Sequence, residues 1–324
     1  MDRIEPAAII ELIEARQRDE VTALVRDIAA TEGLDAAVAV LAEVQYEVGA
    51  RWHCQRWTVA DEHAASAIVD LALTAAAEAT GVASDAPRIV VACVEDEWHV
   101  LPARMLDEQL RARGWPTLFL GSSAPADDLG RFVSQSAPLA VALSCSMDRN
   151  LPGARRSIQA CHAAGVPVVV GGAAFASQGR ADAVGADAAT GSIDSVHRLL
   201  QDWAAEPPAH AEPTVPTPPT LQGTARDRVL DAASRSIVER IHPLATARRH
   251  ELARLRDDVD GLLRAAEAAA HTGDGSIVTD HLAWMGALSE SRGEPVGLTA
   301  VVLEALAAAA PDWLDLGGER PVQV

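Results

Sequence analysis

The sequence predicts a mixed α/β and all-α fold, with a four-helix bundle, a doubly wound five-stranded parallel sheet and a C-terminal helical domain. Three observations support it. Apolar residues recur at helical spacing in the first and last parts of the chain, short apolar runs alternate with helical segments between them, and a proline-rich stretch precedes the last part. The expected domains are residues 1–84 (bundle), 85–205 (α/β), 206–222 (linker) and 223–324 (helical domain).

Four amphipathic segments account for residues 5–80. They read AAIIELIEARQ, VTALVRDIAATEG, LDAAVAVLAEVQYEVGARW and ADEHAASAIVDLALTAAAEATG, with short breaks between them. Each has apolar residues three and four positions apart, which is typical of a helix with one buried face. Four such helices joined by short loops indicate a four-helix bundle.

The pattern changes after Pro87. Five apolar runs, RIVVACV, WPTLFLG, LAVALSCS, VPVVVGG and ADAAT, alternate with helical segments over about 115 residues. The runs are apolar throughout rather than at every second position, which is typical of parallel strands covered on both faces. We therefore expect a doubly wound α/β domain.

The linker and the last domain follow. The segment EPPAHAEPTVPTPPT is rich in proline, so we expect it to be extended and poorly folded. Helical periodicity then returns in ARDRVLDAASRSIVERI, LATARRHELARLRDDVDGLLRAAEAAA, IVTDHLAWMGALSESRG and PVGLTAVVLEALAAAA, with a break at Pro243. These segments predict a third, all-helical domain.

Composition excludes several classes of function. The net charge of −19 repels phosphate backbones, so direct binding of nucleic acid is not expected. The chain has no lysine, which excludes Schiff-base chemistry at a lysine. Its four cysteines have no paired spacing, which argues against a zinc site or a disulfide framework and fits a reducing cytoplasm. Neither a signal peptide nor a membrane-spanning run is recognisable.

Polar and small residues gather where strands of the predicted sheet end. Ligands of open parallel sheets bind beyond the carboxyl ends of the strands. Glu97 and His99 follow the first strand, and a histidine with a carboxylate two residues away suits a metal ligand, because the carboxylate fixes the tautomer. An ordinary solvated loop is the alternative. The same edge carries Ser144 and Ser146 after the third strand and Gly171 and Gly172 after the fourth, where absent side chains would let a ligand approach the backbone.

This set of motifs resembles the cobalamin-binding module. The matching residues are Glu97-Trp98-His99, Ser144-Cys145-Ser146 and Gly171-Gly172. The resemblance implies that His99 is the lower cobalt ligand, that Glu97 supports it, and that Ser144 contacts the buried benzimidazole. Pro102 stands where the family has glycine and Ser146 where it has leucine, and both departures concern the packing of the nucleotide tail.

The stretch RWHCQRWTVADEH, residues 51–63, concentrates titratable and aromatic side chains in the bundle. Trp52, followed after nine residues by Glu62 and His63, is similar to the signature of light-sensing cobalamin photoreceptors. The resemblance implies that Trp52 covers the upper face of the corrin, that Glu62 accepts hydrogen bonds from the adenosyl ribose, and that His53 is a possible upper cobalt ligand after photolysis. A core role for Trp52 is the alternative.

The domain order resembles that of the photocobilins, in which a C-terminal helical domain binds biliverdin. The last domain of this chain has no cysteine, so a bilin there would be non-covalent. Arginine suits the propionates of a bilin, and residues three apart share a helix face. The candidate bilin residues are Arg248, Arg249, His250, His281 and Trp284, although arginine-rich helix faces are usually solvated and Trp284 also suits a core position.

We therefore expect a cytoplasmic light sensor that binds adenosylcobalamin and biliverdin and that is not an enzyme. The best-known photoreceptors carry an N-terminal DNA-binding domain, whereas this sequence starts with the bundle. The signal would then pass to a protein partner, with light-dependent homo-oligomerisation, and without contact to nucleic acid or membrane. The alternatives are a corrinoid carrier for methyl transfer and a cobalamin-dependent antirepressor without bilin.

Overall fold

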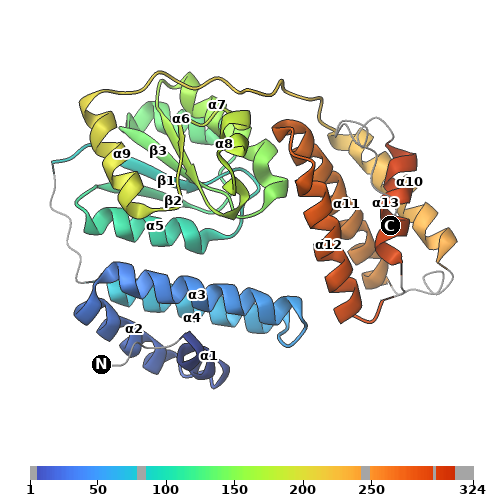
Figure 1. Ribbon diagram of the computed structural model, residues 1–324, viewed down its shortest axis with the longest axis horizontal. Helices are drawn as coiled ribbons and strands as arrows, with labels where there is room; N and C mark the ends of the chain where they lie inside the picture. Colours follow the sequence, from blue (N-terminus) through green and yellow to red (C-terminus); the bar gives the residue numbers. More distant parts are fainter. Residues whose placement is uncertain (1–5, 79–84, 242–248, 295–296, 311–324) are drawn as a thin grey trace.

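The computed structural model describes residues 6–78, 85–241, 249–294 and 297–310. Three units are visible in Figure 1: a helix bundle, an α/β domain lying against it, and a second helical unit beside the α/β domain. The predicted fold class is confirmed. None of the described helices has the length and apolar character needed to cross a bilayer.

The bundle has the four predicted helices, α1 (Pro6–Glu14), α2 (Arg18–Glu32), α3 (Leu34–His53) and α4 (Val59–Ala77). Their apolar stripes meet in a core that includes the fully buried Ile13, Leu41 and Leu73. Leu101 and Met105 of the α/β domain belong to the same core, so the bundle is fastened to the α/β domain by apolar packing.

Five parallel strands form the sheet: β1 (Ile89–Cys93), β2 (Thr117–Gly121), β3 (Ala140–Ser144), β4 (Val168–Gly171) and β5 (Ala188–Ala189). Their order is β2-β1-β3-β4-β5. Strands β1, β3 and β4 are almost entirely buried, which explains their uninterrupted apolar sequences. The strand order reverses between β1 and β3, and this switch point is where open α/β sheets bind ligands.

Helices cover both faces of the sheet, as expected for a doubly wound domain. One face packs on α5 (Val100–Ala112) and α9 (Ile193–Ala205). The other packs on α6 (Ala126–Ser136), α7 (Leu151–Ala163) and α8 (Gln178–Val184). The bundle lies against α5 on the first side (Figure 1).

The helical unit consists of α10 (Gly223–Arg240), α11 (Arg249–Thr272), α12 (Ser276–Ser291) and α13 (Leu298–Ala309). It has its own apolar core, but it also shares the core of the α/β domain. Ala265, Ala268 and Ala269 of α11 and Ile277 of α12 pack into the core on the α7 side of the sheet. Small residues allow this close approach, which the sequence did not predict.

The linker is extended, as predicted, but it is not poorly folded. The Ala211 amide donates to Asp187 Oδ1 at 2.7 Å, and the Thr214 amide donates to the Asp182 carbonyl at 3.1 Å. Pro213 packs directly over Gly185, where an added Cβ would come within 2.9 Å of the proline ring. These contacts hold the linker on the α/β domain.

Candidate functional site

Glu97 is the fully buried centre of the loop that follows β1. Its Oε2 accepts hydrogen bonds from the Ser146 amide (2.8 Å), the Met147 amide (3.0 Å) and Asn150 Nδ2 (3.1 Å). Burial raises the pKa of Glu97, but the hydrogen bonds from His99 and from the Ser146 amide outweigh burial and hold the pKa at about 2. The carboxylate therefore stays charged and joins the loop after β1 to the loop after β3.

His99 is oriented by this carboxylate. Its Nδ1 lies 2.6 Å from Glu97 Oε1, and the same oxygen accepts the His99 amide at 2.9 Å. The bond to Glu97 raises the pKa of His99, burial opposes the shift, and the charges of Arg149 and Glu62 act in opposite directions. With Nδ1 engaged, Nε2 is the nitrogen left to bind a metal, and 56% of the side chain is exposed. The predicted Glu97–His99 pair is present.

A cavity of about 330 Å³ lies between the carboxyl edge of the sheet, α5 and α3. Its lining includes the predicted residues Ser144, Gly171 and Gly172. Pro102 also lines it, so the residue that departs from the family pattern occupies part of this space. The cavity extends along the carboxyl ends of β3 and β4.

Backbone packing gives the two glycines a role that the sequence interpretation did not include. Gly172 has φ of +101°, and a Cβ there would lie 2.3 Å from the Cys145 carbonyl oxygen. A Cβ on Gly171 would lie 2.9 Å from the Thr190 carbonyl oxygen. Both glycines therefore let loops of the protein approach one another, and both also line the cavity.

Two other predicted residues, Ser146 and Trp98, lie outside the lining of this cavity. Ser146 lines a second cavity rather than the first, and its amide, not its side chain, contacts Glu97. Trp98 is 72% exposed beside His99. This exposure leaves the ring accessible to a ligand or partner.

The bundle contributes the predicted residues from the end of α3 and the start of α4. Trp52, His53 and Glu62 are half-buried, whereas His63 is largely exposed, with Nε2 3.4 Å from Glu62 Oε2. Glu62 also accepts a hydrogen bond of 2.8 Å from Ser66 Oγ. The negative charge of Glu62 contributes to raising the pKa of His99, in the direction expected for a carboxylate near an imidazole.

His53 contacts the helical unit. Its ring centroid lies 5.7 Å from that of Trp284, which in turn stacks on His281 at 5.6 Å. The His53 carbonyl accepts a hydrogen bond of 3.3 Å from Ser291 Oγ. His53 Nδ1 and His281 Nε2 are both buried without a hydrogen-bond partner among the described residues. Bundle, sheet edge and helical unit therefore meet at one place.

Of the five candidate bilin residues, the structure brings His281 and Trp284 together. Arg248 lies outside the described residues, and the side chains of Arg249 and His250 do as well. His281 and Trp284 line a cavity of about 190 Å³ together with Arg149, Asp148 and Asp280. Its volume is below the usual range for drug-sized ligands, and two of its charged residues are acidic.

Sequence reasoning missed Asn150 and Arg149, which follow β3, and Arg264 of α11. Arg264 pairs with Asp96, the residue before Glu97, at 3.3 Å. Asp96 has φ of +69°, and its amide donates to Ser123 Oγ at 2.9 Å. Ser144 and Ser146 marked the loop after β3 as part of the site, and Arg149 and Asn150 follow in the same loop. No local sequence pattern linked Arg264 to this loop.

Comparisons with known proteins agree with this geometry. Residues 87–196 and residues 7–76 each match a model described as a B12 binding domain. The chain is 34% identical over 153 residues to the HTH-type transcriptional repressor CarH of Myxococcus xanthus (46% of this chain, 51% of that protein). It is 32% identical over 166 residues to CarA of the same organism (49% and 55%). The chain thus spans about half the length of these curated relatives.

Among solved structures, the monomethylamine corrinoid protein of Methanosarcina barkeri superposes with a TM-score of 0.51 at 14% identity. The match covers 60% of this chain and 96% of that protein, and it supports the fold alone. The two B12 binding matches coincide with the bundle and with the sheet that carries the Glu97–His99 pair. The chain is therefore a cobalamin-binding protein, whose B12-binding module is formed by the bundle and the α/β domain.

Proposed function

We propose that this protein is a light sensor that uses adenosylcobalamin, with His99 as the lower cobalt ligand. Bound adenosylcobalamin supplies a cobalt–carbon bond that light can break. The observation that carries the proposal is the orientation of His99, whose Nδ1 is held by the buried Glu97 while Nε2 is left for cobalt. The cavity lined by Ser144, Gly171 and Gly172 would receive the nucleotide tail.

The bundle would cover the other side of the cofactor. Trp52 and Glu62 lie at the ends of α3 and α4, on the part of the bundle that acts electrostatically on His99. His53 would provide a second imidazole once the adenosyl group has left. Because its ring contacts Trp284, any movement of His53 would disturb the contact between bundle and helical unit. This coupling would change the assembly of the protein and signal to a partner.

We propose biliverdin only as a second chromophore of the helical unit. Trp284 and His281 would give it an aromatic wall and Arg149 a cation. The described cavity does not fit a whole linear tetrapyrrole, because it is small and because Asp148 and Asp280 would oppose propionates. Red absorbance of protein co-expressed with a haem oxygenase would support this second chromophore.

The sensor proposal is tested by reconstituting the full chain with adenosylcobalamin and recording spectra before and after green light. We expect the corrin bands to shift on illumination, and His99→Ala to lose most of its bound pigment. His197→Gln, a histidine outside the lining of the cavity, is the matched control and should behave like the native protein. Unchanged bands after illumination, or identical bands in His99→Ala, would contradict the proposal.

The alternatives make different predictions. A corrinoid carrier would turn over methyl groups in the dark with a methyltransferase partner. A cobalamin-dependent antirepressor would share the light response and bind a transcription factor, without red absorbance from a bilin. The curated relatives are named as transcriptional repressors. We propose that this chain does not bind DNA directly, because its net charge is −19.

A further inference from the structure

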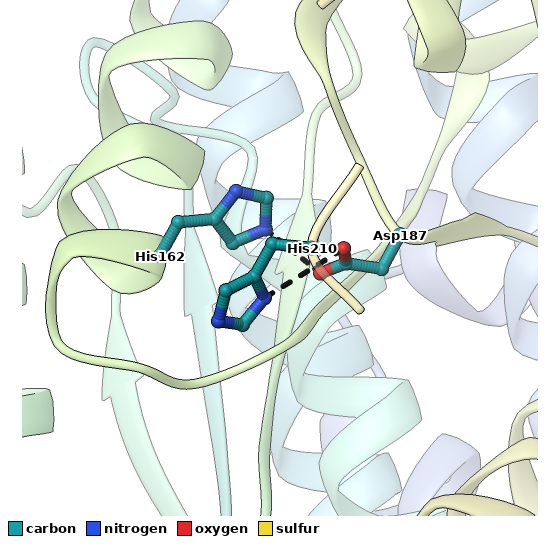
Figure 2. Close-up of side chains that lie close together, drawn as sticks. All are labelled: His162, Asp187 and His210. Carbon is teal, nitrogen blue, oxygen red and sulfur yellow. Dashed lines mark hydrogen bonds and ion pairs between the residues drawn. The ribbon is translucent and has the colours of Figure 1, made fainter. Parts of the chain in front are cut away.

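Three side chains converge at the edge of the sheet opposite to His99. His162 lies in the last turn of α7, Asp187 directly precedes β5, and His210 belongs to the linker. Figure 2 shows both imidazole rings directed at the carboxylate of Asp187. His162 and His210 are 48 residues apart in the sequence, so only the docking of the linker brings them together.

The geometry of this cluster suits a cation. His162 Nε2 lies 2.8 Å from Asp187 Oδ2, and His210 Nδ1 lies 3.8 Å from Asp187 Oδ1. The available nitrogen and oxygen atoms all lie within 4.8 Å of one another. Ligand atoms on a tetrahedral zinc ion with bonds of 2.0–2.1 Å are about 3.3 Å apart, between the two observed separations. A small movement of the His210 ring would complete a two-nitrogen, one-oxygen site.

The surroundings hold the cluster in place. The Val168 amide donates to Asp187 Oδ2 and the Ala211 amide to Asp187 Oδ1, each at 2.7 Å. Each carboxylate oxygen has a second lone pair, so these bonds orient Asp187 without using up its capacity. The carboxylate side chain is only 1% exposed, and the two rings stack at 4.3 Å with an angle of 19° between their planes.

His210 is not needed to satisfy Asp187 by hydrogen bonding. Two amides and His162 already contact the carboxylate, and the 3.8 Å separation of His210 is too long for a hydrogen bond. The ring is nevertheless held over His162 with its Nδ1 facing the carboxylate. A metal ion shared by the three side chains would explain this arrangement.

We propose that His162, Asp187 and His210 bind a zinc-like divalent metal ion that fastens the linker to the α/β domain. Imidazole and carboxylate are common zinc ligands, and three protein ligands leave a fourth position for water. The Val168 and Ala211 amides would orient the carboxylate from behind. Because His210 is in the linker, the metal would fix the path by which the chain reaches the helical unit. The site is independent of the cobalamin proposal.

The test uses the full chain without a polyhistidine tag, stripped of metal with a chelator and titrated calorimetrically with zinc chloride. We expect one zinc ion per chain, and a loss of affinity of at least about tenfold in His162→Ala and in His210→Ala. Cobalt(II) in place of zinc should give visible absorption bands that both variants lose. His197→Gln, elsewhere in the same domain, should bind like the native protein.

A second measurement reports on the linker. Zinc should slow deuterium exchange at the amides of Ala211 and Thr214 in the native chain but not in His210→Ala. His210 is partly exposed and belongs to no helix or strand, so this variant should fold normally, which circular dichroism would verify. Absence of zinc binding in the native chain, unchanged binding in both variants, or loss of zinc binding in His99→Ala instead would overturn the proposal.

Discussion

Two helical units flank the α/β domain, and the interactions that attach them to it differ. The bundle packs on α5 through large apolar side chains such as Leu101 and Met105. The helical unit approaches through alanines, and its contact includes the buried Arg180 and the buried imidazole of His271. Apolar contacts respond little to charge and pH, whereas buried charges and imidazoles respond strongly. The bundle contact also includes the ion pairs Arg113–Asp35 and Arg104–Asp70, but the two carboxylates are half-exposed, whereas Arg180 and His271 are buried. We therefore expect the attachment of the helical unit to depend more strongly on pH and charge, and we call it the conditional attachment.

The conditional attachment also reaches the candidate cobalamin site. Arg264 pairs with Asp96 beside Glu97, and Trp284 contacts His53. The two B12 binding matches lie within residues 7–196, so the helical unit is outside them. Under the proposed function, this unit is the part placed to transmit a change at the site.

The largest loss of stability among the variants that test this comparison is expected for Arg180→Met. Arg180 Nε lies 2.7 Å from Asp274 Oδ2 in the turn between α11 and α12, and Nη1 lies 3.1 Å from Asp148 Oδ1. Removing the cation leaves both carboxylates without their ion-pair partner, although Ser276 still donates to Asp274, and this should cost about 3 kcal/mol. Urea unfolding would measure the loss, and hydrogen exchange should rise mainly in α11 and α12.

Leu101→Ala is the matched variant on the other side. It should cost a similar free energy of unfolding, since truncating a buried leucine costs about 3 kcal/mol, but exchange should rise in α3 and α4 instead. If both variants loosened the same helices, the two attachments would not be separate.

The second effect concerns pH. Burial, together with the charges of Arg155 and Arg156, lowers the pKa of His271 to about 4. The folded state therefore keeps His271 neutral, while the unfolded chain takes up a proton below the ordinary value of 6.5. The stability contributed by this difference is complete above pH 6.5 and is lost as the pH falls toward 4. From pH 8 to pH 5 the loss should be about 2 kcal/mol.

His271→Leu should remove this part of the pH dependence, since leucine cannot be protonated. His281, with its pKa lowered to about 4, acts in the same direction. Asp258, with its pKa raised by burial to about 6, acts in the opposite direction. The free energies of unfolding of the native protein and of His271→Leu are therefore compared at both pH values. The difference between their pH dependences is the contribution of His271. Equal slopes in the two proteins would show that His271 does not make the attachment conditional.

The features that could be predicted from the sequence are those that a local pattern of residues determines. Buried parallel strands have continuous apolar runs, so all five strands were found, and Glu97 and His99 were paired because they are two residues apart. Contacts between distant segments have no such pattern. Asn150 reaches Glu97 across 53 positions, and His210 reaches the Asp187 cluster only because the linker docks. The packing of the helical unit on α7 depends on alanines, which look alike on every helix face.

The smallest effect is expected at the start of α4, the helix that carries Glu62. Thr58 and Asp61 form a capping box, in which the Asp61 amide donates to Thr58 Oγ1 at 3.2 Å and the Thr58 amide donates to Asp61 Oδ2 at 3.0 Å. Thr58→Ala should cost about 1 kcal/mol and raise exchange in the first turn of α4. Thr58→Ser keeps the hydroxyl and should stay close to the native protein. Because the cap lies within the bundle, α11 and α12 should exchange as before; a rise there would mean that the bundle is also conditionally attached.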